Sequence, residues 1–171
     1  MHPKEFQKRR RILMELMGFG GIAVIAAAPE RNRSRDVTHS YRQDSDFYYL
    51  TGFCEPEAVA VLIPGRRQGE FVMFCRERDK EREMWDGLRA GPEGVVSKYG
   101  ADDAFPLEDI EEILPGLLEE NERVYYSMGV IAEFDQRLLG WMNRLHSRRQ
   151  SGHAPDELIT LDHLVHEMRL F

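Results

Sequence analysis

Short continuous runs of apolar residues are spread along the chain and predict buried strands. "IAVIAAA", residues 22–28, is one such run, and Pro29 stops it. A run of this kind has no polar face, so we expect the strand to be covered on both sides. "AVAVLI" at 58–63 and "EFVMFC" at 70–75 are joined by the turn "PGRRQG", which predicts a hairpin. "RVYYSM" at 123–128 is a further predicted strand.

Other segments repeat their apolar residues every three or four positions, which predicts amphipathic helices. The first helix opens the chain, and Gly18 ends it. The residues expected on one face of it are Phe6, Arg10, Leu13, Leu16 and Met17. Further helices are predicted up to Trp85 and at 92–99, 106–120, 132–149 and 162–171. Pro115 lies inside 106–120 and is expected to kink or break that helix, because proline lacks an amide hydrogen.

The segment "YRQDSDFYYLTGFCEPEA", residues 41–58, combines aromatic and acidic residues with Gly, Pro and Cys. A binding site, a metal site and a stiff loop are all compatible with that composition. We predict a short helix that Ser45 or Asp46 caps and Gly52 ends. The residues expected to pack are Phe47, Tyr48 and Leu50. Carboxylates such as Asp44 and Asp46 complement the dipole at a helix start, so we expect capping rather than acid–base catalysis.

Predicted strands and helices alternate along the chain, with one hairpin inside the series. This order predicts an α/β fold, in which a mixed β-sheet is flanked by helices on both faces. A length of 171 residues predicts a single domain covering 1–171. The last predicted helix ends at Phe171 with apolar residues and without Gly, Asn or a polar tail. Because helices usually close with such a cap, we expect the natural chain to continue.

Charge and composition narrow the range of partners. The net charge of −7 disfavours a dedicated nucleic-acid binder. Basic residues outnumber acidic ones up to Arg42 while 102–122 is acidic, which suits self-association or two solvated faces.

No membrane contact is expected, since no apolar run approaches the ~20 residues of a span. The stretch "KRRRILMELMGFGGIAVIAAAPE" is similar to a secretory signal peptide, but Glu15 interrupts its apolar run, so we do not expect a cleaved signal. Cys54 and Cys75 are too few for a disulfide framework, which favours a cytoplasmic setting.

Candidate metal ligands are few. "DHLVHE" places His163 and His166 three positions apart, with Asp162 before them and Glu167 after. Zinc-binding helices need two His at i and i+4 with Glu between them, or the inverted order. Without a third ligand, we expect this pair to be a surface or interface feature. His39 lies in a polar connection that cannot hold ligands in place.

Trp85 allows two interpretations. An amphipathic segment could bury it, yet it precedes "DGLRAG", whose glycines permit an exposed loop. Tryptophan in such a loop is often a recognition anchor. "RNRSR" at 31–35 could bind phosphate but has no interleaved aromatic residues, so a solvated loop or a salt-bridging contact is favoured. The residues alone therefore predict an α/β domain without a catalytic centre of its own.

Several of these segments resemble the N-terminal domain of bacterial Xaa-Pro aminopeptidase, also called aminopeptidase P. They are "YRQDSDFYYLTGFCEPEAVAVLI", "EFQKRRRILMELM", "RERDKEREMWDGLRAGPEG" and "LVHEMRLF". The likeness spans nearly the whole chain in order and is loosest in "SGHAPDELITLDHL". The resemblance implies a fold like that of creatinase and prolidase N-terminal domains.

The resemblance also implies a larger catalytic "pita-bread" domain after this one. In the family, that domain holds two metal ions, typically manganese, and activates a water that removes the residue before a second-position proline. The metal ligands are two Asp, one His and two Glu, and none is expected here. This chain is therefore expected to hold no cofactor and no catalytic residue, and to be inactive alone.

Partners and site residues follow from the same resemblance. The domain is expected to contact its own catalytic domain, to form a dimer or tetramer, and to meet short proline-containing peptides. By position, Trp85 resembles a tryptophan that lines the substrate site of a neighbouring subunit. Asp36 resembles an acid at the same mouth.

Two other functions stay open at this point. The domain could be a non-catalytic peptide- or protein-binding module, as in relatives that have lost catalysis. It could also precede a prolidase, which shares the architecture and accepts only dipeptides.

Overall fold

The computed structural model describes residues 2–30, 41–148 and 154–170. Its strands form one six-stranded sheet in the order β4-β3-β2-β1-β5-β6. The strands are β1 (Gly21–Ala26), β2 (Val59–Leu62), β3 (Phe71–Cys75), β4 (Asp103–Pro106), β5 (Arg123–Tyr126) and β6 (Glu157–Thr160). The helices are α1 (Pro3–Met17), α2 (Ser45–Thr51), α3 (Lys80–Asp86), α4 (Gly91–Tyr99), η1 (Leu107–Asp109), α5 (Ile110–Leu118), α6 (Ala132–Ser147) and α7 (Leu161–Arg169).

Strand β1 lies inside the sheet and explains why the sheet is mixed. It pairs antiparallel with β2, with Ala23 opposite Leu62, and parallel with β5, with Ile22 beside Val124. The hairpin β2–β3 is antiparallel, whereas β4 and β6 each add a parallel strand at an edge. The predicted mixed sheet with one hairpin is confirmed.

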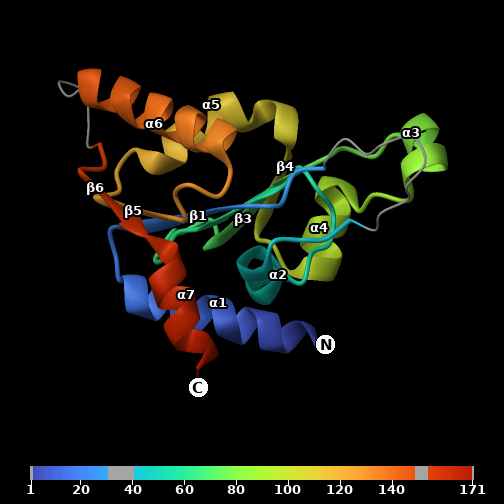
Figure 1. Cartoon of the computed structure of the whole chain (residues 1–171), viewed down its shortest axis with the longest axis horizontal. Coiled ribbons are helices and arrows are strands. Elements are labelled where there is room, and N and C mark those ends of the chain that lie inside the picture. Colours follow the sequence, from blue (N-terminus) through green and yellow to red (C-terminus); the bar gives the residue numbers. More distant parts are fainter. Residues whose placement is uncertain (1, 31–40, 149–153, 171) are drawn as a thin grey trace.

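Helices cover both faces of the sheet, as the uninterrupted apolar strands predict (Figure 1). On one face, α5 and α6 pack over Ile22 and Val24. On the other face, α1, α2, α4 and α7 pack over Ala23 and Ile25. Successive side chains of β1 thus enter opposite halves of the core, which is why this strand has no polar position.

Three details differ from the sequence-based prediction. The edge strands β4 and β6 were not predicted. Helix α5 continues through Pro115 to Leu118, because Leu114 and Leu118 are fully buried on either side of the proline and packing holds the turn. Leu16 was expected on the buried face of α1 but is 52% exposed. Within the described residues, no helix combines the length and apolar character needed to cross a bilayer.

Candidate functional site

The exposed end of α3 is the first candidate site. Helix α3 stands away from the sheet at one end of the molecule (Figure 1). Asp79 caps it by accepting from the backbone N–H groups of Glu81 and Arg82 at 3.1 and 3.2 Å. Trp85 is 88% exposed, so of its two interpretations burial in an amphipathic segment is excluded. We call Met84, Trp85 and Leu88, all more than 80% exposed, the tip, and residues 76–90 the arm.

The aromatic segment 41–58, which contains α2, is held in place by hydrogen bonds. Gln43 organises it: its Oε1 accepts from the Ala28 N–H at 2.9 Å, and its Nε2 donates to the carbonyls of Phe53 and Glu55 at 3.2 and 2.9 Å. The Tyr41 hydroxyl donates to the Ala28 carbonyl, and burial raises the pKa of that hydroxyl, so it remains a donor. Sequence reasoning missed Gln43, because a glutamine in a polar stretch carries no local signal.

Helix α2 within this segment is capped by Asp44, which confirms the capping role expected of this carboxylate, whereas Ser45 and Asp46, the other candidates, lie inside the helix. The Asp44 carboxylate accepts from the Phe47 N–H at 2.9 Å. Phe47 and Leu50 are fully buried as predicted, and Tyr48, although 39% exposed, packs edge-on against Phe6. Gly52 ends the helix with a φ of 72°, which confirms its predicted role.

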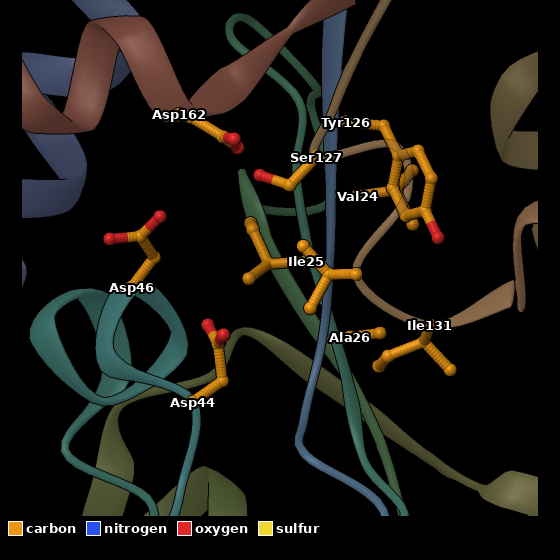
Figure 2. A pocket seen from close by; sticks show the side chains of 10 residues that line it. Val24, Ile25, Ala26, Asp44, Asp46, Tyr126, Ser127, Ile131 and Asp162 are labelled. Atoms are coloured by element: carbon orange, nitrogen blue, oxygen red, sulfur yellow. The ribbon is translucent and has the colours of Figure 1, made fainter.

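A small acidic cavity of about 90 Å³ opens where the parallel strands β1 and β5 end. Figure 2 shows Asp44 and Asp46 on one side of it, with Asp162 and Ser127 nearby. Burial, and then the neighbouring Asp44, raise the pKa of Asp46. Arg169 pairs with Asp46 at 3.3 Å. Two of the three carboxylates thus have structural roles: Asp44 caps α2, and Asp46 pairs with Arg169 of α7.

The histidine pair of "DHLVHE" lies on the exposed side of α7, as expected of a surface feature. His163 and His166 line an open depression together with Asp46 and Arg169. Across residues 2–30, 41–148 and 154–170, no three His, Cys, Asp or Glu side chains are grouped so that they could hold a metal ion. Asp36 and His39 lie outside the described residues, as does "RNRSR", so the structure gives no distance from Asp36 to Trp85.

Comparison with known proteins finds relatives along the whole chain. A family model described as "Aminopeptidase P, N-terminal domain" matches residues 6–125. The chain is 42% identical over 170 residues to the Xaa-Pro aminopeptidase of Escherichia coli (strain K12), covering 98% of this chain and 38% of that protein.

Solved structures give the same picture. Aminopeptidase PepP from Pseudomonas aeruginosa is 56% identical with a TM-score of 0.95, covering 100% of this chain and 39% of that one. A zinc-substituted E. coli aminopeptidase P in complex with product is 42% identical with a TM-score of 0.92, over the same shares. The chain therefore spans less than two fifths of the length of these relatives.

Proposed function

Because the chain belongs to the aminopeptidase P N-terminal domain family, we propose that it is the assembly and access-limiting domain of a metal-dependent Xaa-Pro aminopeptidase. The parent enzyme removes the first residue from peptides with proline in second position. Its two divalent metal ions, manganese by the family resemblance, are held by a catalytic domain that follows this chain. A zinc-substituted relative supports metal dependence.

The observation that carries the proposal is identity of 42% or more along nearly the entire chain to proteins of this activity. The named relatives are aminopeptidases, which favours this function over a prolidase or a binding module. The free thiols of Cys54 and Cys75 favour a cytoplasmic location.

The tip of the arm is the part of the chain that we assign to peptide recognition, across a contact between subunits of a dimer or tetramer. Trp85 is exposed on a projecting helix, so it is available to a neighbouring molecule (Figure 1). An aromatic face provides a large apolar surface for a proline ring, and a wall from another subunit would exclude folded proteins from a catalytic cleft. By resemblance, we assign Asp36 to the same recognition role.

Hydrolysis of Xaa-Pro peptides with added Mn²⁺ tests the proposal, measured on this chain and on the longer protein. The longer protein should hydrolyse them and this chain should not. In the longer protein, Trp85→Ala should raise KM about three- to tenfold for tripeptides and longer peptides, as expected for loss of an aromatic anchor. Phe19→Ala is the matched control, because Phe19 is 81% exposed and lies outside the arm. Activity of this chain alone would contradict the proposal, and unchanged kinetics of Trp85→Ala would remove the recognition role.

A further inference from the structure

Helix α3 contributes no apolar residue to the core. Every residue of the helix is described, and the one that is buried is Glu83. Met84 and Trp85, which follow it, are 83% and 88% exposed. Since helices in proteins are usually held by an apolar face, polar contacts must fix the direction of this one.

The carboxylate of Glu83 joins the two ends of the arm. On the outgoing side, Arg78 donates from Nε to Oε1 at 3.1 Å and from Nη2 to Oε2 at 3.4 Å. On the returning side, the backbone N–H of Arg89 donates to Oε1 at 2.9 Å. The Glu83 side chain is only 4% exposed, whereas that of Arg78 is 62% exposed. Removal of the Glu83 carboxylate would free Arg78 to turn toward water and would leave the Arg89 N–H without its acceptor, so the two ends of the arm would no longer be joined.

A second carboxylate fixes the base of the arm. Glu55, from the connection after α2, accepts from the Ala90 N–H at 2.9 Å and from Arg76 Nη2 at 3.4 Å. Arg89 in turn donates from Nη1 to the carbonyl of Glu77 at 3.1 Å. The base is thus tied to the body of the protein by Glu55, and Glu83 connects that base to the helix bearing Trp85.

We propose that Glu83 is a positioning residue, which fixes the direction in which Trp85 projects from the arm. Arg78, and then the Arg89 N–H, hold the pKa of Glu83 below its usual range, so the carboxylate is charged at neutral pH. The proposal rests on the proposed function for what Trp85 meets. The ordering of the arm is measurable without it.

The first experiment uses nuclear magnetic resonance on the 171-residue chain. In Glu83→Ala, the heteronuclear NOE of the Trp85 indole N–H should fall, and exchange of the Arg89 amide should accelerate at least about tenfold. Glu81→Ala is the matched control, because Glu81 lies on the exposed side of the same helix and should leave both values unchanged. Trp141, which is 1% exposed in α6, has its own indole signal, and that signal reports whether the fold persists.

The magnetic resonance results of the Glu83 variants can overturn the proposal in two ways. A folded Glu83→Ala chain with unchanged Trp85 and Arg89 signals would overturn the positioning role. If Glu83→Ala does not fold, Glu83→Gln decides, because it retains one acceptor oxygen and loses the charge. Its Arg89 exchange should lie between those of the wild type and an unprotected amide, and a wild-type value would overturn the proposal.

Kinetics of the longer protein then link the arm to recognition. Glu83→Ala should raise KM for tripeptides by about the same factor as Trp85→Ala, with little change in kcat, and the double variant should add little. If Trp85→Ala raises KM and Glu83→Ala does not, the positioning role of Glu83 is refuted while the recognition role of Trp85 stands. No effect of Trp85→Ala would refute the recognition role, while the magnetic resonance result for Glu83 would stand.

Discussion

The close approach of α1 to Gly52 gives a quantitative test of the fold. At Gly52, φ is 72°, and a Cβ atom would lie 2.6 Å from Cε2 of Phe6. Placing alanine in the left-handed region costs about 1–2 kcal/mol. The collision with the Phe6 ring adds about 1–3 kcal/mol, as overpacked cores do. Gly52→Ala should therefore lower the free energy of unfolding by about 2–5 kcal/mol.

Gly140 provides the matched control for the same chemical change. It lies within α6, and an added Cβ would meet nothing within 4 Å. Gly140→Ala should stabilise the protein by about 0.5–1 kcal/mol, because alanine is the better helix former. The two substitutions are thus predicted to have opposite signs.

Urea unfolding followed by far-ultraviolet circular dichroism measures both free energies, and the slope with urea concentration should be unchanged. Repeating Gly52→Ala in a Phe6→Ala background isolates the steric part. There the cost should fall to about 1–2 kcal/mol, since only the backbone penalty remains. A cost below 1 kcal/mol for Gly52→Ala in the wild-type background would refute the argument.

Three further predictions concern surface and capping residues. Trp85→Ala should change the free energy of unfolding by less than about 0.5 kcal/mol, because the side chain is 88% exposed; a larger change in urea unfolding would show that the tip is structural. Asp44→Ala should cost about 0.5–2 kcal/mol in thermal unfolding and Ser45→Ala much less, and the reverse order would place the cap at Ser45. The hydrogen bond from Trp141, and then that from Arg137, hold the pKa of Glu111 below its usual value of 4.5. The stability that this carboxylate contributes is thus present above pH 4.5 and is lost as the pH falls through its lowered pKa. The difference in the free energy of unfolding between wild type and Glu111→Gln should therefore shrink on acidification. A constant difference would contradict the assignment.

The sequence predicts the central part of the fold because apolar runs define strands covered on both faces. The family and the α/β architecture are confirmed by the comparisons. Strands β4 and β6 escaped prediction because each is short and half-exposed at a sheet edge, and β4 ends in a proline, so neither has a strand pattern of its own.

The candidate site was less predictable. The sequence indicated Trp85 but could not decide between burial and exposure, since periodicity in a highly charged seven-residue helix does not define a buried side. Glu83 was missed because one acid among several gives no local sign that its carboxylate joins Arg78 to Arg89. Such a contact depends on which residues the tertiary structure brings next to the carboxylate, and the neighbouring sequence does not encode that.

The packing of α7 against α1 also has a consequence during synthesis. Leu13 and Met17 of α1 share one core cluster with Leu161 and Val165 of α7, and Figure 1 shows the two helices together on one face. A ribosome adds about 5–20 residues per second, so the opening helix waits roughly ten seconds or more for the helix that completes its surroundings. During that interval the part of its apolar side that α7 later covers is open to chaperones or to aggregation.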